Sequence, residues 1–122
     1  MKDNDIISKS GTELVLLSLL KERDMYGYEL RQMIAEYSGH LYDIPEGSMY
    51  IFLYRLSENG YISERKVMLG ERRTRVYYHL EPAGTMYIEK LYKKYQKVIK
   101  GLTALLSKTM ADTNAERTGS TD

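Results

Sequence analysis

The first strongly patterned segment of the chain is LVLLSLL, residues 14–20, which is apolar on nearly all sides. It predicts a helix over about residues 12–21 that other elements cover on more than one side. The preceding sequence SGTE, from Ser10 to Glu13, has the form of a capping box and predicts the start of this helix.

Two more helices are predicted before residue 60. One begins near Gly27, carries an apolar stripe and ends at Ser38. The other follows the breaker-rich sequence PEGS and covers about residues 48–59, where an Asn-Gly pair stops it. Its packing residues are spaced i, i+3, i+4, i+7 on one face and are Met49, Phe52, Leu53 and Leu56.

The opposite face of this third helix is unusual for a solvated surface. With 3.6 residues per turn, this face presents Tyr50, Ile51, Tyr54, Arg55 and Glu58 rather than a run of Lys, Glu and Gln. Two tyrosines and an isoleucine on the side away from the packing face indicate a contact surface.

After Gly60 the pattern changes to that of extended strands. The sequences YISERKVML and RVYYHL flank a glycine-containing turn, GERRT, and predict a two-stranded hairpin. Although the net charge of the chain is only +1, residues 62–79 carry five basic side chains against two acidic ones. A local basic patch of this kind suits a polyanionic partner.

Pro82 suits the first turn of a last helix, which meets no strong breaker before about Lys108. Such a helix is roughly 40 Å long, more than a domain of this size can cover alone. Its apolar residues keep a heptad spacing typical of pairing with a second copy, and the first helix is expected to fill the junction. The residues expected to form this dimer contact are Leu16, Leu20, Ile88, Leu91, Tyr92, Tyr95, Val98, Ile99, Leu102, Leu105 and Leu106.

Three helices, a hairpin and a long helix are the element order of a winged helix-turn-helix followed by an oligomerisation helix. We therefore expect a mainly α fold with a small β-hairpin (α+β). The expected division is a DNA-binding domain over residues 1–80, a dimerisation helix over 81–108 and a disordered tail over 109–122.

The absence of cysteine and of long apolar segments excludes several classes of protein. The chain contains no cysteine, which excludes a disulfide framework, a thiolate zinc site and a cysteine nucleophile. No window approaches the roughly 20 apolar residues that a membrane-spanning helix needs, and the N-terminus lacks the apolar run of a signal peptide. We expect a cytoplasmic protein without a membrane partner or a cofactor.

Residues with catalytic potential are few. The two histidines, His40 and His79, are predicted in a turn and on a strand, without the spacing of zinc ligands. The sequence has no phosphate-binding glycine loop, nucleophile elbow or dinucleotide fingerprint. We therefore expect neither an enzyme nor a metal site.

The third helix and the hairpin together predict an interface for double-stranded DNA. Ser48 and Tyr50 can donate to phosphates near the helix N-terminus, and Ile51 can touch a thymine methyl. Three arginines within four residues suit a wing that follows the DNA backbone or the minor groove. The predicted contact residues are Ser48, Tyr50, Ile51, Tyr54, Arg55, Lys66, Arg72, Arg73 and Arg75. In a twofold dimer, two recognition helices would lie about 34 Å apart, one turn of DNA.

Two other functions remain open at this point. A winged-helix protein-interaction module would use Tyr50, Ile51 and Tyr54 to bind another polypeptide, and a ligand sensor would bind DNA only incidentally. The salt dependence of binding distinguishes the protein-interaction module from a DNA-binding protein. Contacts between arginines and phosphates weaken steeply as the salt concentration rises, whereas apolar contacts do not.

Three stretches of the chain, MYGYELRQMI, IPEGSMYIFLYRLSENGYI and RVYYHLEPAG, resemble the PadR family of bacterial transcriptional regulators. The likeness runs from about Leu14 to Tyr92. It implies a homodimeric repressor of the small subclass with a single C-terminal helix. Such a repressor binds a palindromic operator and releases it when a small aromatic or cationic effector binds. The resemblance also implies DNA contacts at Ser48, Tyr50 and the wing residues Arg73 and Arg75.

The chain departs from the pattern of the PadR family at several positions. Ile51 stands where the family often has proline, and Arg72 stands where the wing tip usually has glycine. Glu81 replaces the usual threonine before the last helix. The chain has no tryptophan, whereas some relatives sandwich drugs between tryptophans. An effector site would therefore use tyrosines such as Tyr92 or Tyr95.

Overall fold

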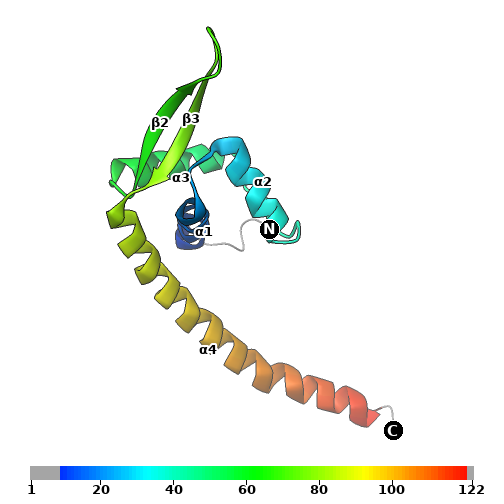
Figure 1. The fold of residues 1–122 in the computed structure, drawn as a ribbon. Coiled ribbons are helices and arrows are strands. Elements are labelled where there is room, and N and C mark those ends of the chain that lie inside the picture. Colours follow the sequence, from blue (N-terminus) through cyan, green and yellow to red (C-terminus); the bar gives the residue numbers. More distant parts are fainter. Residues whose placement is uncertain (1–8, 121–122) are drawn as a thin grey trace. The chain divides into compact units, whose positions relative to one another are not determined.

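The computed structural model describes residues 9–120 of the chain, with side chains for residues 9–110. Helices predominate in this described part, and the strands form one small antiparallel sheet (Figure 1). This is the mainly α class, with a small β component, that the sequence predicts. The elements in chain order are α1 (Lys9–Glu22), β1 (Met25–Tyr26), α2 (Gly27–Tyr37), α3 (Glu46–Glu58), β2 (Ile62–Met68), β3 (Thr74–Leu80) and α4 (Pro82–Ser120).

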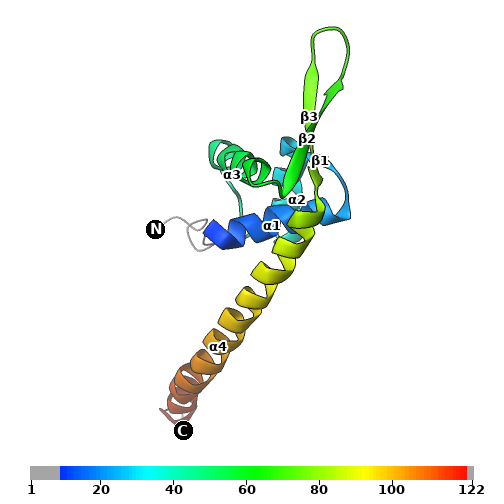
Figure 2. The same ribbon diagram turned by 90° about the vertical axis from the view of Figure 1, so that its left-hand side faces the viewer.

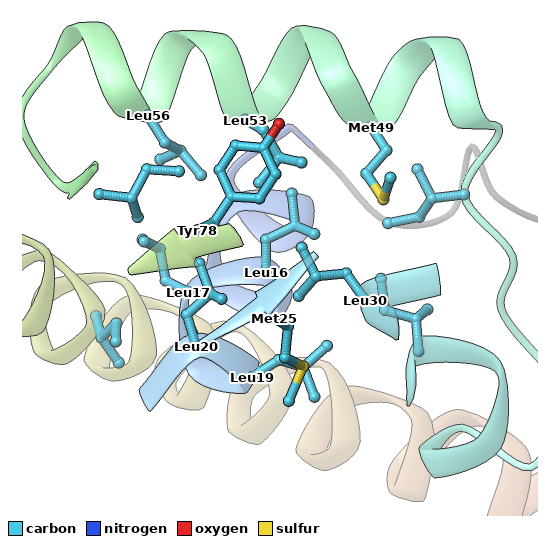
Figure 3. Close-up of a cluster of buried hydrophobic side chains, with 14 of the residues drawn as sticks. Leu16, Leu17, Leu19, Leu20, Met25, Leu30, Met49, Leu53, Leu56 and Tyr78 are labelled. Atoms are coloured by element: carbon cyan, nitrogen blue, oxygen red, sulfur yellow. The ribbon is translucent and has the colours of Figure 1, made fainter. Parts of the chain in front are cut away.

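The hydrophobic core surrounds α1, which explains why that helix is apolar on nearly all sides. Leu16 and Leu17 are fully buried, and burial of each such side chain contributes about 1.5–3 kcal/mol. Figure 3 shows Met49 and Leu53 of α3 and Tyr78 of β3 pointing into the same cluster. The core thus fixes α3 and the sheet against α1.

α1 begins earlier than the capping box predicts. Ser10 already lies inside the helix, which the structure describes from Lys9 onward, so the predicted start at Thr12 was wrong. Thr12 is buried, and Glu13 accepts a hydrogen bond from the Tyr87 hydroxyl at 3.0 Å. Glu13 therefore contacts the start of α4 instead of capping α1.

α3 has well-defined ends. Pro45 precedes its first residue, and the fixed φ of proline suits the start of a helix. At the other end, the Tyr61 N–H donates to the Leu56 carbonyl at 3.0 Å and Gly60 has a φ of 77°. This is a Schellman motif, which favours glycine in the left-handed conformation. The observed bounds lie within two residues of those that the sequence predicts.

The sheet contains three strands in the order β1-β3-β2. β2 and β3 form the predicted hairpin, with Ile62 opposite Leu80. Figures 1 and 2 show this hairpin projecting beyond α1, α2 and α3, so it is a wing. The sequence did not reveal β1, whose Met25 pairs with Tyr78, because two residues are too few for an alternating pattern.

The first turns of α4 are fixed to the turn that joins α3 and β2. The Tyr61 carbonyl accepts the Glu81 N–H at 3.0 Å, and the Tyr61 ring stacks on Tyr87 with centroids 4.2 Å apart. The Ser63 hydroxyl donates to the Glu81 carboxylate at 2.6 Å. A Cβ on Gly84 would overlap the Tyr61 carbonyl oxygen and lie 3.1 Å from its carbon. Tyr61 therefore joins the end of α3, the start of β2 and the start of α4.

Four of the residues predicted to contact a second copy lie inside the core of the single chain. Leu16 and Leu20 of α1, together with Ile88 and Leu91 of α4, are at most 8% exposed. α2, α3 and β3 of the same chain pack around α1, and all four side chains belong to the hydrophobic core. Their contact with a second copy stays a prediction.

Beyond Leu91, α4 forms a second unit of the structure. The helix continues to Ser120, past the predicted end near Lys108 and into the residues predicted as a disordered tail. Residues 121–122 lie outside the described residues. The sequence contains no proline after Pro82. Because proline is the residue that most strongly breaks a helix, nothing of this kind ends α4 earlier. Tyr95 is half-buried. The other predicted dimer residues of this unit are 43–60% exposed and are Tyr92, Val98, Ile99, Leu102, Leu105 and Leu106.

Candidate nucleic-acid interface

α3 exposes to solvent the face that the sequence predicts. Its other face is fully buried through Met49, Leu53 and Leu56. Ile51 is 54% exposed and Tyr54 is 63% exposed, and neighbouring large apolar side chains of this kind are typical of a contact surface. All the predicted contact residues of this helix are exposed, namely Ser48, Tyr50, Ile51, Tyr54 and Arg55.

The tip of the wing carries exposed positive charge. The Leu69 N–H donates to the Arg73 carbonyl at 2.8 Å, and Gly70 has a φ of 123°, in the region that favours glycine. Arg72 and Arg73 are exposed in this turn, and Lys66 is exposed on β2. Within the described residues, none of these three side chains forms an ion pair. Their charge is therefore available to an anionic partner.

Arg75 differs from Arg72 and Arg73 because its guanidinium already contacts its own chain. Its guanidinium lies 3.9 Å from the centroid of the Tyr26 ring, well within the range of cation–π attraction. Hydrogen bonding to Tyr77 raises the pKa of the Arg75 guanidinium above its ordinary value. A side chain held in this way loses less rotamer freedom when it meets an anion. Sequence reasoning placed Arg75 in the interface but missed these contacts, since Tyr26 belongs to the unpredicted strand β1.

The wing and α3 meet at a hollow of about 430 Å³, which we call the wing-root hollow. Its walls come from Tyr50 of α3, from β1 and the start of α2, and from the hairpin between Leu69 and Tyr78. Three predicted contact residues, Tyr50, Arg73 and Arg75, therefore share one concave surface. The lining residues are Tyr26, Gly27, Tyr50, Leu69, Arg73, Thr74, Arg75, Val76 and Tyr78.

Tyr78 supplies a neutral, buried wall of the wing-root hollow. Only 6% of this residue is exposed. Burial, with smaller effects from Glu64 and Tyr50, raises the pKa of Tyr78 to about 12. Like an ordinary tyrosine hydroxyl, the Tyr78 hydroxyl is protonated at neutral pH and adds no negative charge that would repel a phosphate.

A second polar cluster joins Asp24, directly before β1, to side chains of β2 and β3. His79 Nδ1 is 2.7 Å from Asp24 Oδ1, and Arg65 Nη2 is 3.5 Å from Asp24 Oδ2. The Arg65 guanidinium also lies 5.5 Å from the Tyr77 ring centroid. Sequence reasoning missed this cluster because Asp24 and His79 are 55 positions apart. Its contacts fix the approach to β1 against β2 and β3.

In the described part of the chain, no group of three or more His, Asp or Glu side chains could hold a metal ion. None of its helices is both long and apolar enough to cross a membrane.

Comparison with known proteins identifies relatives of this chain. Residues 16–90, more than half of the sequence, match the model of the transcriptional regulator PadR-like family. A solved transcriptional regulator from Clostridium thermocellum is 33% identical, with a TM-score of 0.74 over 82% of this chain and 96% of that chain. An uncharacterized protein of Lysinibacillus sphaericus is 29% identical over 80% of this chain and 89% of its own length.

A more distant likeness concerns the fold alone. Bacillus subtilis PadR, solved in complex with operator DNA, is 22% identical, with a TM-score of 0.59 over 64% of this chain and 44% of that chain. The family match covers α2, α3 and the wing, the elements that form the candidate interface. The chain belongs to the PadR-like family of transcriptional regulators.

Proposed function

We propose that this chain is a homodimeric regulator that binds palindromic double-stranded DNA and represses transcription. The observation that carries the proposal is the wing-root hollow, where the exposed face of α3 meets wing arginines without an ion-pair partner. The operator DNA bound by the Bacillus subtilis relative supports a duplex as the partner.

The two parts of the interface would perform different tasks. Arg72, Arg73 and Lys66 would contact phosphates, which supplies affinity without sequence preference. α3 would enter the major groove, where Ile51 and Arg55 can touch base edges and so supply specificity. Charge on the wing and apolar surface on α3 thus match the two components of DNA recognition.

Dimerisation is assigned to the part of α4 beyond Leu91. Its exposed apolar residues, such as Val98, Leu102 and Leu105, have no cover within the described chain. Pairing with a second copy would bury them and would present two α3 helices to successive turns of a duplex. The proposed division is therefore a DNA-binding domain followed by a dimerisation helix.

Release by a small aromatic or cationic effector completes the proposed function. Such a molecule can shift the dimer only if it binds one dimer shape more tightly than the other. Exposed Tyr92 and half-buried Tyr95 are aromatic side chains that could contact it. Screening phenolic compounds and cationic drugs for release of bound DNA would test this step.

The primary test begins with selection of an operator from random DNA by the purified protein. We then expect Arg72→Ala/Arg73→Ala to weaken binding to operator and non-specific DNA alike, because the two arginines would contact phosphates. Each lost phosphate contact should reduce the slope of log K against log salt by about 1. Fluorescence anisotropy at several salt concentrations measures both quantities.

A matched control for this test removes two positive charges elsewhere. Lys93→Ala/Lys97→Ala changes exposed lysines of α4 and should leave the salt slope of the wild type. Equal slopes for the wing variant and the wild type would contradict the wing assignment.

The exposed apolar side chains of α3 favour a second candidate function. Ile51 and Tyr54 could instead bind another polypeptide. In that case the selection would yield no operator, and binding to the partner would vary little with salt.

A further inference from the structure

Gly27 and Tyr50 make an unusually close contact in the wing-root hollow. Gly27 is the first residue of α2 and is buried, whereas Tyr50 belongs to the first turns of α3. A Cβ at residue 27 would lie 2.8 Å from Tyr50 Cζ and 3.0 Å from Cε1, and it would overlap the hydroxyl. The Tyr50 ring therefore occupies the space that a side chain at residue 27 would need.

Backbone conformation does not require glycine at this position. The glycines with positive φ in the described chain are Gly39, Gly60 and Gly70, so the φ of Gly27 is one that alanine also adopts. Alanine is moreover the better helix former. What glycine supplies at residue 27 is space.

We propose that Gly27 is a positioning residue for DNA binding, which holds the Tyr50 hydroxyl in the wing-root hollow that Arg73 also lines. This inference rests on the proposed function, because it assigns a role within the same interface. A hydroxyl and a guanidinium that line the same hollow can both donate to one phosphate in it. Gly27 itself touches no DNA and acts through the ring of Tyr50.

The consequence of filling this space depends on which atoms must give way. Those nearest to residue 27 are the far end of the Tyr50 side chain, and Tyr50 is 42% exposed. The ring can therefore rotate into solvent at little cost to the fold. Gly27→Ala should move the hydroxyl out of the interface and leave the protein folded.

Gly47 provides the matched control. It lies in the first turn of α3, near Tyr50 in sequence, and a Cβ there would meet nothing within 4 Å. Gly47→Ala is the same chemical change in the same region of the protein. It should leave the Tyr50 ring in place, and its effect on DNA affinity should be the same in the wild-type and Tyr50→Ala backgrounds.

The experiment measures operator affinity and melting temperature for Gly27→Ala and Gly47→Ala, each alone and combined with Tyr50→Ala. We expect Gly27→Ala to weaken operator binding on the order of tenfold, the loss typical of a hydrogen bond to a charged group. Its melting temperature should stay close to that of the wild type. In the Tyr50→Ala background, Gly27→Ala should cause no further loss. Ethylation interference measures how much ethylation of each phosphate weakens binding. The same phosphate should show reduced interference in Gly27→Ala and in Tyr50→Ala.

Several results would overturn the inference. Wild-type affinity in Gly27→Ala would show that the ring position is irrelevant, and an equal loss in both backgrounds would show that Gly27 acts without Tyr50. A large fall in melting temperature would show that the ring cannot move aside. Failure of the proposed function is distinguishable, because the wild-type protein would then select no operator.

Discussion

At the scale of single residues, the surroundings of the tyrosines divide them into structural and contact groups. The chain has twelve tyrosines. Tyr78 and Tyr87 are held within the fold, and burial raises the pKa of each hydroxyl to about 12; for Tyr87, the hydrogen bond to Glu13 adds to this shift. Tyr54, by contrast, is 63% exposed on α3. Composition alone does not reveal this division, because it depends on which element covers each ring.

The raised pKa values of Tyr78 and Tyr87 predict a loss of stability in alkaline solution. The pKa of Tyr87 is about 12 in the folded chain and 10.0 ordinarily, so between these values the folded state keeps a proton that the unfolded state releases. The free energy of unfolding should therefore be unaffected by this group below pH 10 and should fall as the pH rises toward 12. Urea unfolding at a series of pH values measures this slope.

A variant separates the contribution of Tyr87 from that of other groups. Tyr87→Phe should make the alkaline slope shallower because it removes the ionisable hydroxyl. A slope in Tyr87→Phe as steep as that of the wild type would contradict the assignment.

At the scale of elements, periodicity predicted the helices and the hairpin because most of them bury one face in the core. α3 is the clearest case, since one spacing rule identified both its buried and its exposed faces. The start of α1 was wrong because Glu13 contacts Tyr87, far away in sequence, instead of capping its own helix. The contact of Arg75 with Tyr26 in the candidate site was not foreseen because these two residues are also far apart in the sequence.

The junction of α3, β2 and α4 allows a prediction for the elements that meet there. Gly84→Ala should destabilise the protein by about 1–3 kcal/mol, as overpacking typically does. The atoms that a Cβ would meet include the Tyr61 carbonyl, which belongs to the backbone and cannot rotate away. Urea unfolding, followed by circular dichroism, measures the change.

Gly101 is the matched control within the same helix. A Cβ there would meet nothing within 4 Å, so Gly101→Ala should stabilise the chain by up to about 1 kcal/mol through helix propensity. Effects of the same sign for Gly84→Ala and Gly101→Ala would refute the proposed role of the junction.

At the scale of the whole molecule, the exposed stripe of α4 predicts how the assembly can be broken. Leu102→Glu/Leu105→Glu places two charges on the apolar face and should convert the proposed dimer into a monomer, because burying unpaired charges is costly. Analytical ultracentrifugation measures the oligomeric state. The monomer should bind a palindromic operator more weakly but should still recognise a half-site.

The control for this variant adds the same charges outside the stripe. Gln96→Glu/Ser107→Glu changes two exposed polar residues of α4 and should leave the dimer intact. A wild-type chain that sediments as a monomer at micromolar concentration would exclude the proposed assembly.

The shortness of β1 has a consequence for solubility. In the described part of the chain, β1 pairs only with Tyr77 and Tyr78, so the edge of β3 toward Thr74 remains open. An open edge can recruit a strand from another molecule and so initiate aggregation, and charged side chains on a short edge oppose this. Arg73 and Arg75 stand at this edge. The charges that suit the wing to a polyanion would thus also keep neighbouring molecules from joining their sheets into fibrils.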